Sequence, residues 1–445
     1  MAAKKSSVTI ESEYKTSFRV EEVATMLLSL RLNNFMIYNQ EVEFSMLANM
    51  HYRRFPTNVA SVNGVHALKT AVLLGPNNTG KTNFVCAVSM MKSIMLNQAA
   101  GIVPSFFSGN DIVEAGISFL ENGGEYIFEI RYDTAHRDYI YERFIEIQRD
   151  KYRNVKHRTL LLRDIHKKEY YADDEALVAA MRVASRNNLL IYLLDTESFP
   201  TLSHIRETIT AFASSIDVVD MNNIPIKKTI DMLKMSNEDS QRVAKFVLNA
   251  DLSLEDFRYA SDDEVRIVFQ SVNTDKSVPQ EKALQQAAPL AEMLHLVSVY
   301  HGVPVPSIIY DSTGTKKMAA LASYVIGALR NGRTLIVDEL DNSLHFRLTR
   351  AIISLFNNEL NENAQLIVTA HDTSLLDCHS LFRKEQIWFT HKDQDRAYLY
   401  SLAEFTANES KTRGTSDLIA KYCAGVFGAL PEPDLFETLQ EMRGS

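Results

Sequence analysis

The first third of the chain is marked by short apolar runs in which apolar and polar positions alternate. Six of these runs are predicted strands, at residues 27–32, 41–44, 116–120, 125–132, 141–147 and 158–163. The first two flank N-N-F-M-I-Y-N-Q and predict a hairpin. The next two flank N-G-G, a turn sequence that favours a second hairpin. The last two runs are of the same kind, and we expect them to extend the same sheet.

Three other runs are almost wholly apolar and predict strands that are buried on both faces. They are residues 67–74, T-L-I-V-D-E-L at 334–340 and Q-L-I-V-T-A-H at 365–371. Residues 81–96 are mostly apolar or good helix formers and predict a helix. Because these runs lie near both ends of the chain, we expect the two ends to build one sheet together.

Between residues 172 and 300 the pattern changes to helical periodicity. One apolar stripe recurs at helical spacing, at Val243, Phe246, Val247 and Ala250. Ser236 or Asn237 can cap this helix. No heptad pattern persists over three repeats, which argues against a long coiled coil. The middle of the chain therefore predicts a helical insertion in an α/β fold.

Composition narrows the functional classes. The chain has 445 residues, a net charge of −9 and a pI near 5.8, so contact with nucleic acid would need a local basic patch. Cys86, Cys378 and Cys423 are too widely spaced for a disulfide framework or a zinc site, and we expect buried thiols. The sequence shows no signal-like segment and no run of 18 apolar residues. We therefore expect a cytoplasmic protein without a membrane contact.

G-P-N-N-T-G-K-T at residues 75–82 fits the phosphate-binding pattern G-x-x-x-x-G-K-[ST] at every fixed position. It stands between a predicted strand and a predicted helix, which is the context that the motif requires. Glycines let backbone N–H groups surround phosphate oxygens, the lysine brings charge to them, and the hydroxyl holds Mg²⁺. These roles fall to Gly75, Gly80, Lys81 and Thr82. A chance match in a glycine-containing turn is the alternative.

Two carboxylates end the predicted strand in L-I-V-D-E-L-D-N-S-L-H, residues 335–345. Ligands of open α/β sheets bind at such strand ends. Asp338 is expected to bind Mg²⁺ through its waters, and Glu339 to orient or deprotonate the attacking water. His371 follows the next apolar strand, where a neutral imidazole can hydrogen-bond the γ-phosphate or the water. Residues that merely face solvent at strand ends are the alternative for all three.

The spacing of these motifs separates classes of P-loop protein. Lys81 and Asp338 are 257 residues apart, far more than compact GTPases or motor cores place between these elements. Between them, D-S-T-G-T-K-K at 311–317 precedes an apolar helical pattern, and a Ser and a Gly at a helix start form an anion cradle. Ser312 and Gly314 match the signature position of ABC-type ATPases, which reaches the partner subunit's γ-phosphate. A plain helix cap is the alternative.

In this order the motifs resemble the ABC-class ATPase heads of SMC proteins and OLD-type nucleases. L-R-L-N-N-F near the start, and R-K-E-Q-I-W-F-T-H-K-D, L-Y-S-L and Y-C-A-G-V-F-G-A-L-P near the end, are similar to stand-alone ATPase subunits of anti-phage operons of the RloAB and PARIS kinds. The resemblance covers roughly residues 26–150 and 300–432. It implies an ABC-type P-loop ATPase head with a mixed sheet, split by the helical insertion.

That resemblance divides the chain into four parts. They are an N-terminal arm at 1–25, an N-terminal lobe of the head at 26–171, the helical insertion at 172–300 and a C-terminal lobe of the head at 301–445. Two heads of a homodimer, or of a higher even-numbered homo-oligomer, would sandwich two ATP molecules with Mg²⁺, and Asp341 would act across their interface. The implied cofactor-binding residues are Gly75, Pro76, Asn77, Asn78, Thr79, Gly80, Lys81, Thr82, Asn83, Ser312, Gly314 and Asp341. The signature departs from L-S-G-G-Q, and no Mg²⁺-sensing glutamine is assigned.

The sequence shows no nuclease of its own, because only 74 residues follow His371 and D-Q-D at 393–395 is better explained as a hairpin turn. The resemblance therefore implies an effector protein from an adjacent gene, a nuclease or toxin, with a phage protein as a candidate trigger. The segment 149–168 holds eight Lys and Arg residues. It is a candidate surface for nucleic acid or a DNA-mimicking protein, and a solvated hairpin edge is the alternative.

Three further functions stay open. A DNA clamp or repair ATPase like the SMC proteins would bind DNA in an ATP-dependent way, and the lack of a coiled coil counts against it. A transporter ATPase would carry a closer L-S-G-G-Q and a membrane partner. A scaffold that binds ATP without turnover also stays open, because Glu339 is the only catalytic base in these motifs.

Overall fold

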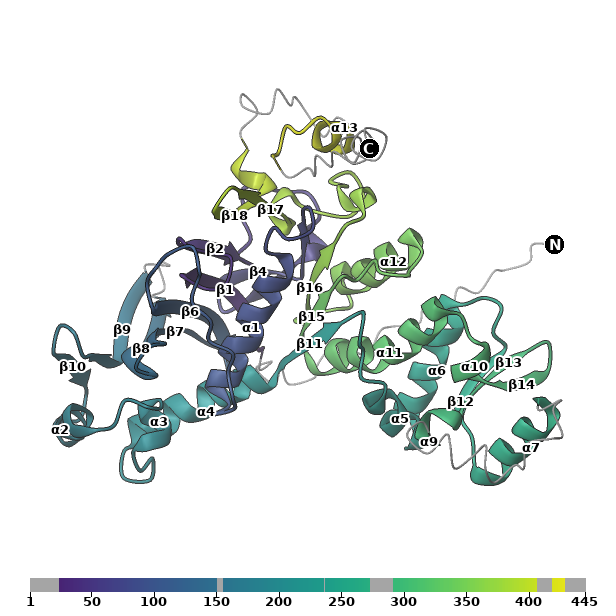
Figure 1. The fold of residues 1–445 in the computed structure, drawn as a ribbon, viewed down its shortest axis with the longest axis horizontal. Coiled ribbons are helices and arrows are strands. Elements are labelled where there is room, and N and C mark those ends of the chain that lie inside the picture. Colours follow the sequence, from purple (N-terminus) through teal and green to yellow (C-terminus); the bar gives the residue numbers. More distant parts are fainter. Residues whose placement is uncertain (1–23, 150–154, 236, 273–290, 406–417, 429–445) are drawn as a thin grey trace, which may run out of the picture.

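The computed structural model describes residues 24–149, 155–235, 237–272, 291–405 and 418–428. Within these ranges the chain forms two large sheets and a separate lobe that consists mainly of helices (Figure 1). Helix α1 (Lys81–Met95) lies between the two large sheets, and its apolar side chains share one core with both. The prediction of a helix at residues 81–96 is confirmed.

The seven-stranded sheet is antiparallel throughout and confirms the two predicted hairpins and their extension. In the order β10-β9-β8-β7-β6-β1-β2, its strands are Glu169–Ala172, Val155–Asp164, Asp138–Arg149, Gly124–Asp133, Ile112–Glu121, Met26–Asn33 and Val42–Ser45. Between β6 and β7, Asn122 and Gly123 have φ angles of 50° and 76°. Positive φ at both central positions is what a two-residue Asn–Gly hairpin turn requires.

The six-stranded sheet is mixed and draws its strands from both ends of the chain, as predicted. In the order β11-β15-β16-β5-β17-β18, its strands are Ile216–Asp220, Thr334–Asp338, Gln365–Ala370, Thr70–Leu74, Ile387–Asp393 and Arg396–Ser401. All neighbours are parallel except β17 and β18. These two form a hairpin whose turn holds D-Q-D at 393–395, as expected.

The predicted strand at residues 67–74 is two strands in different sheets. β4 (Val65–Leu68) pairs with β3 (Val59–Val62), whereas β5 lies in the middle of the six-stranded sheet. The break falls at Lys69, a buried lysine between the two strands. A continuous apolar run does not mark a change of sheet, so periodicity alone did not predict this boundary.

Both faces of the six-stranded sheet are covered. The two large sheets and the helices packed on them form one unit, the two-sheet body. Its helices from the C-terminal part of the chain are α11 (Thr313–Asn331), α12 (Phe346–Asn357) and α13 (Leu418–Cys423), and its 3-10 turns are η1 (Pro56–Asn58), η3 (Thr373–Leu375), η4 (Lys384–Gln386) and η5 (Leu402–Glu404). Leu73 and Ile336 face α1 and the seven-stranded sheet. The alternate residues Leu74 and Val337 face α11 and α12. This alternation explains why the parallel strands are apolar throughout.

The structure differs from the helical insertion expected at residues 172–300. Helices α2 (Glu175–Val183), α3 (Leu190–Leu193) and α4 (Pro200–Ser214) lead into β11, which is a strand of the six-stranded sheet. Phe212 of α4 stacks on Phe119 of β6, with ring centroids 4.1 Å apart. α3, α4 and β11 therefore belong to the two-sheet body. The I-D-V-V-D run of β11 is too short and too polar for its period to stand out.

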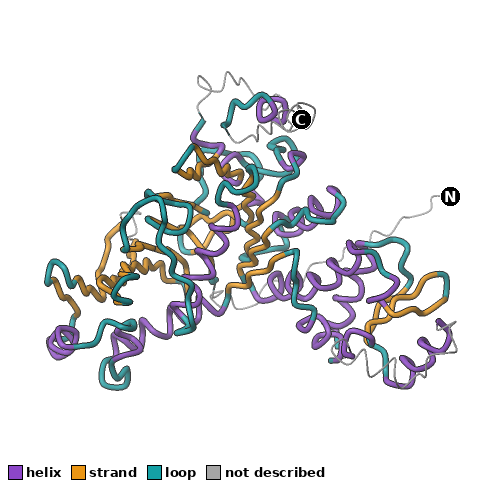
Figure 2. The backbone as a smooth tube through the Cα atoms, in the orientation of Figure 1, coloured by secondary structure: helices purple, strands orange, loops and turns teal. Residues whose placement is uncertain are grey.

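The rest of this segment, with residues up to 310, forms the separate lobe. Its elements are α5 (Lys227–Lys234), α6 (Glu238–Ala250), β12 (Asp256–Tyr259), α7 (Asp262–Val272), α9 (Ala291–Leu294), β13 (Leu296–Tyr300), β14 (Val303–Pro306) and α10 (Ser307–Tyr310). Figure 2 shows the small sheet β12-β13-β14 among these helices. Asn237 caps α6 as predicted, and Val243 and Val247 of the predicted stripe are buried. Ser236, the other candidate cap, lies outside the described residues.

A buried amide joins the two large sheets. Gln365 is fully buried at the start of β16. Its Nε2 donates to the carbonyls of Leu27 and Leu68 at 3.0 and 2.9 Å. Its Oε1 accepts from the N–H of Leu27 at 2.7 Å and from the hydroxyl of Thr334 at 3.1 Å. One side chain thus links strands β1, β4 and β15.

We predict that Gln365→Met lowers the free energy of unfolding by about 3 kcal/mol, because a side chain of similar length leaves buried backbone groups of Leu27 and Leu68 without partners. Urea denaturation followed by the fluorescence of Trp388 measures this change. Trp388 is the only tryptophan and packs against Phe44 of the other sheet, with ring centroids 4.9 Å apart.

Gln98→Met is the matched control, because Gln98 is exposed after the end of α1. We expect this change to leave the transition within about 0.5 kcal/mol of that of the original protein. A Gln365→Met transition that coincides with that of the control would contradict the role of the buried amide.

Candidate nucleotide-binding site

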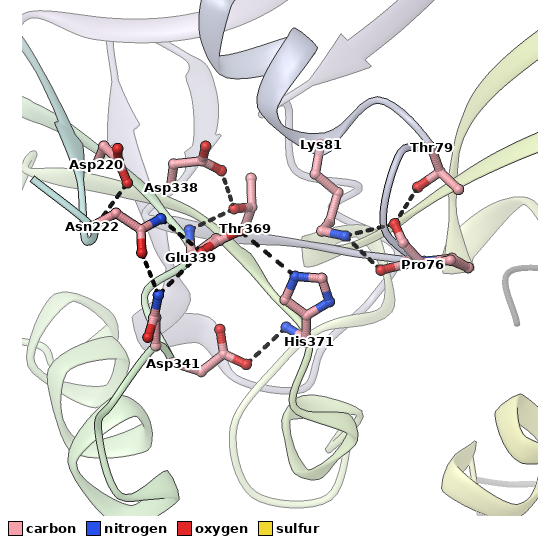
Figure 3. Close-up of polar contacts among 12 residues, drawn as sticks. Pro76, Thr79, Lys81, Asp220, Asn222, Asp338, Glu339, Asp341, Thr369 and His371 are labelled. Atoms are coloured by element: carbon pink, nitrogen blue, oxygen red, sulfur yellow. Dashed lines mark hydrogen bonds and ion pairs between the residues drawn. The ribbon is translucent and has the colours of Figure 1, made fainter. Parts of the chain in front are cut away.

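The predicted motifs meet at one edge of the six-stranded sheet. β16 pairs in parallel with both β5 and β15, so the carboxyl ends of these three strands lie side by side. The phosphate loop follows β5, Asp338 and Glu339 lie at the end of β15, and His371 follows β16 (Figure 3). The structure therefore brings together three of the four motifs that the sequence singled out.

Two positions of the loop require glycine, because neighbouring atoms leave no room for a side chain. A Cβ on Gly75 would lie 2.4 Å from the carbonyl oxygen of Thr390, and one on Gly80 would lie 2.8 Å from the hydroxyl of Tyr38. Gly80 also has a φ of 116° and is the N-cap of α1. Because glycine offers no capping side chain, the first N–H groups of α1 stay available for phosphate oxygens.

Tyr38 and Thr390 hold the loop in place through hydrogen bonds, and neither residue belongs to a sequence motif. The fully buried Tyr38 hydroxyl donates to the Gly80 carbonyl at 2.9 Å, and burial raises the pKa of Tyr38, which keeps it protonated. The hydroxyls of Thr79 and Thr390 are 2.7 Å apart. Thr79 also donates to the Pro76 carbonyl at 2.8 Å.

The rest of the loop is open. Asn77 and Asn78 are exposed, and Asn78 has a φ of 62°. Thr82, in the first turn of α1, is also exposed. Asn83 donates from Nδ2 to the sulfur of Met36 at 3.0 Å. The predicted cofactor-binding residues of this loop thus divide into an exposed rim and a buried support.

Lys81 is folded back into the loop. Its ammonium donates to the carbonyls of Gly75 and Pro76 at 2.6 and 2.8 Å (Figure 3). Burial lowers the pKa of Lys81 to about 8, although the charges of Asp338 and Glu339 oppose this shift. A buried ammonium that bonds only neutral carbonyls, beside the N-terminus of a helix, fits an anionic phosphate chain.

A threonine joins the carboxylate of Asp338 to the backbone of Glu339 at the end of β15. The hydroxyl of Thr369, on β16, donates to Oδ1 of Asp338 and accepts from the N–H of Glu339 at 2.7 Å. Asp338 is buried, and its charge helps to raise the pKa of the Cys86 thiol on α1, after the larger effect of burial. Thr369 is visible in the sequence only as the polar residue within an apolar run.

The oxygen atoms in this site fit a Mg²⁺ ion that takes its other ligands from a nucleotide and from water. In the described part of the chain, no group of three or more His, Cys, Asp or Glu side chains could hold a metal by itself. Mg²⁺ in such sites typically takes one or two protein oxygens and completes its shell with phosphates and waters. The Thr82 hydroxyl and the Asp338 carboxylate are the oxygens that these motifs supply.

Glu339 is held in a constrained conformation. Its φ is 55°, and its Oε2 accepts from the amides of Asn222 and Asn342 at 2.9 and 3.2 Å. The hydrogen bond from Asn222 is the largest effect that lowers the pKa of Glu339, and burial opposes it. Its Oε1 lies 4.0 Å from Nε2 of His371. Glu339 is therefore an ionised carboxylate at the edge of the space beside Lys81.

Asp341 makes contacts within its own chain. Its Oδ2 accepts from the backbone N–H groups of His371 and Asp372 at 2.8 and 2.7 Å. These bonds fix the turn that presents His371, whose side chain is 40% exposed. The other oxygen of Asp341 is buried and has no partner in the described residues. A role of Asp341 across an interface stays a prediction.

Ser312 and Gly314 lie in a separate pocket of about 400 Å³, which Asp251, Ser343 and His345 also line. Ser312 is the N-cap of α11, and its hydroxyl accepts from the N–H of Thr315 at 3.1 Å. A Cβ on Gly314 would lie 3.0 Å from the Ser343 carbonyl oxygen, so the turn packs closely on the segment after Glu339. The structure thus places the predicted signature turn beside this segment of the same chain.

The basic segment at 149–168 is partly neutralised within the chain. Arg149 pairs with Glu125 at 2.7 Å, and Arg158 pairs with Asp173 at 2.8 Å. Arg163 is fully buried and pairs with Glu142. Residues 150–154 lie outside the described residues. These pairs leave fewer free cations for nucleic acid than the sequence suggested.

The expectation that all three cysteines are buried is met in part. Cys378 is buried as expected, but Cys86 is only partly buried and Cys423 is exposed, so the prediction of three buried thiols was wrong. Among the residues that the structure describes, no helix combines the length and apolar character that crossing a membrane requires.

The architecture is α/β with a mixed sheet beside the phosphate loop, as the sequence predicted. Three solved structures of SMC heads match this chain. The SmcHead bound to the C-winged helix domain of ScpA is 14% identical, with a TM-score of 0.44, covering 84% of this chain and 97% of that one. The SMC head domain from Thermotoga maritima is 11% identical, with a TM-score of 0.40, covering 84% and 98%.

The third is the Smc head domain with an extended coiled coil, bound to the C-terminal domain of ScpA derived from Pyrococcus furiosus. It is 12% identical, with a TM-score of 0.37, covering 85% of this chain and 96% of that one. At these identities and scores the likeness does not bear on function.

A family model also matches the sequence itself. No curated protein matches the chain. Residues 71–377, which run from β5 past His371 and cover well over half of the chain, match the family described as "AAA domain, putative AbiEii toxin, Type IV TA system". The match spans the phosphate loop, both carboxylates of β15 and the histidine. The chain therefore belongs to this family of AAA-domain proteins.

Proposed function

We propose that this protein binds and hydrolyses Mg-ATP between two heads and uses the bound nucleotide to control a partner protein. The observation that supports it most is the convergence of groups suited to phosphate, to Mg²⁺ and to water at one sheet edge. Lys81 and the start of α1 fit phosphates, Thr82 and Asp338 fit Mg²⁺, and Glu339 and His371 face the same space.

The residues of the site divide the work. The N–H groups at the start of α1 and the Lys81 ammonium hold the β and γ phosphates. Thr82 and Asp338 supply ligands to Mg²⁺, which neutralises charge on the phosphates when bound. Glu339 orients or deprotonates the attacking water, and His371 donates to the γ-phosphate or holds the water.

A second copy of the chain completes the site in this proposal. Ser312 and Gly314 lie in their own pocket beside the segment at 342–345, and the start of α11 gives that pocket an anion-binding character. In a homodimer or a higher even-numbered oligomer, this turn would reach the nucleotide of the other copy. Asp341 would lie near the same interface.

The partner that we propose is an effector from an adjacent gene, a nuclease or toxin, in an anti-phage system of the RloAB or PARIS kind. The family description names a toxin and a Type IV TA system but no separate effector, so this part of the proposal rests on the resemblance of the sequence motifs. A phage protein is the candidate trigger. Nucleic acid is a weaker candidate ligand, because ion pairs occupy part of the segment at 149–168.

We predict that Glu339→Gln lowers phosphate release by at least about 100-fold while ATP still binds, because the variant keeps the shape of the site and loses the base. Light scattering should then show twice the protomer mass with Mg-ATP and the protomer mass without it. Asp372→Asn serves as a control for charge removal nearby. Unchanged mass together with unchanged turnover in Glu339→Gln would count against the two-head mechanism.

We predict that the protein takes up a proton when it binds ATP near pH 9. The pKa of Lys81 is about 8 in the free site, and phosphates favour its charged form, so the pKa rises on binding. Affinity should be flat below about pH 7 and should fall up to about tenfold per pH unit above about pH 8. Calorimetry at pH 9 in two buffers of different ionisation enthalpy measures the uptake, expected to be about 0.9 proton.

Lys81→Arg is the control for that measurement, because arginine stays charged over this range. Its binding enthalpy should not depend on the buffer. Equal enthalpies in both buffers for the unmodified protein would show that Lys81 is already fully charged in the free site.

We predict that the product of an adjacent gene co-purifies with this chain in one nucleotide state and dissociates in another. Tagged protein co-expressed with the neighbour, and washed with or without Mg-ATP, tests this directly. Lys81→Met should fix the complex in its nucleotide-free behaviour, because it removes the charge that holds the phosphates. A neighbour that is retained in no nucleotide state would contradict control of an effector.

A further inference from the structure

We propose that Asn222 is a positioning residue for Glu339 and forms, with Asn342, a two-amide clamp on that carboxylate. No motif marks Asn222, and it lies 117 positions before Glu339 in the chain. The proposal rests on the proposed function, in which Glu339 orients or deprotonates the attacking water.

The backbone around Asn222 is fixed to the strand that carries Glu339. β11 and β15 are parallel neighbours, and Asp220 and Asp338 are register partners. The N–H of Met221 donates to the Asp338 carbonyl at 3.1 Å. The N–H of Asn222 donates to Oδ1 of Asp220 at 2.8 Å. These bonds bring the Asn222 side chain to the end of β15.

The three side chains form a closed set of hydrogen bonds (Figure 3). Nδ2 of Asn222 donates to Oε2 of Glu339 at 2.9 Å. Nδ2 of Asn342 donates to the same oxygen at 3.2 Å and to Oδ1 of Asn222 at 2.6 Å. A carboxylate only accepts hydrogen bonds, so both amides must present their NH₂ groups to it. The orientation of each amide is therefore dictated by the other two groups.

The clamp occupies one carboxylate oxygen of Glu339 and leaves the other to contact a water molecule. Oε2 of Glu339 has two donors, whereas Oε1 points toward His371, whose Nε2 is 4.0 Å away. That separation is too long for a direct hydrogen bond, so Oε1 can accept from a water on the His371 side. A base is effective only when its lone pair faces the reacting water, so holding Oε2 directs Oε1. Asn222 thereby acts on turnover through Glu339.

Helix α11, which carries the predicted signature turn, contacts Asn342 and the loop that follows Asn222. Its Lys317 ammonium donates to the carbonyl of Asn342 at 3.3 Å. Its Tyr324 hydroxyl donates to the carbonyl of Pro225, in the loop that follows Asn222, at 3.4 Å. The position of α11 therefore acts on the backbone of Asn342 and on the loop that follows Asn222. In this way the clamp connects the signature helix to the carboxylate.

The test measures ATP turnover of Asn222→Ala and Asn222→Asp beside Asn223→Ala and Asn223→Asp. Asn223 is an exposed neighbour whose backbone N–H donates to the Asp220 carbonyl. Loss of the Asn222 donor should lower kcat about tenfold and leave KM for ATP within about twofold, because the clamp touches no phosphate. Asn222→Asp should lose at least as much, since it sets two carboxylates together, and Asn222→Gln should lose less, since it keeps the amide.

Epistasis separates positioning from a structural effect. In the Glu339→Gln background, Asn222→Ala should not lower residual single-turnover hydrolysis further, because the group that it positions is gone. A structural role would make the two losses additive and would overturn the proposal. Asn222 variants that match the Asn223 controls, with Glu339→Gln inactive, would also overturn it. Unchanged turnover in Glu339→Gln would instead sink the proposed function itself.

Discussion

The parallel register of β5, β15 and β16 is the constraint on which the site depends. Segments that are far apart in the chain reach one place because neighbouring parallel strands end at the same edge. Apolar side chains fix that register from both faces, since a slip of one residue would turn the buried residues of β15 toward the wrong core. The strand ends that carry Lys81, Asp338 and His371 are therefore placed by apolar packing around β5, β15 and β16.

The central strand β16 also carries two buried polar residues, and each does a different task. Gln365 at its start ties the two large sheets together, and Thr369 near its end joins Asp338 to Glu339. Buried polar groups persist where their hydrogen bonds are satisfied, and both side chains use donor and acceptor atoms together. Thr369 ties the Asp338 carboxylate to the backbone of Glu339, so one hydroxyl helps to place the two residues that we propose as Mg²⁺ ligand and as orienter of water.

The phosphate loop, the two carboxylates and His371 could be predicted because each is a contiguous motif with local chemistry, beside a strand of recognisable pattern. The hairpins could be predicted because short turns such as Asn122–Gly123 leave little choice of partner. By contrast, the place of β11 in the six-stranded sheet follows from pairing with β15, which no local period reveals. Asn222 was missed for the same reason: its relation to Glu339 exists only once those strands are neighbours.

The signature turn is tied to the rest of the site through the segment that follows Glu339. Gly314 packs on the Ser343 carbonyl, and Lys317 donates to that of Asn342. If this turn contacts a phosphate of the nucleotide held by another copy, that contact would act on Asn342 and, through Asn342, on the Glu339 carboxylate. Asp341, in the same segment, holds the backbone of His371. In the proposed function, this short segment touches the groups assigned to a second copy, to the attacking water and to the γ-phosphate. It would therefore couple the pairing of heads to hydrolysis without a larger rearrangement of the sheet.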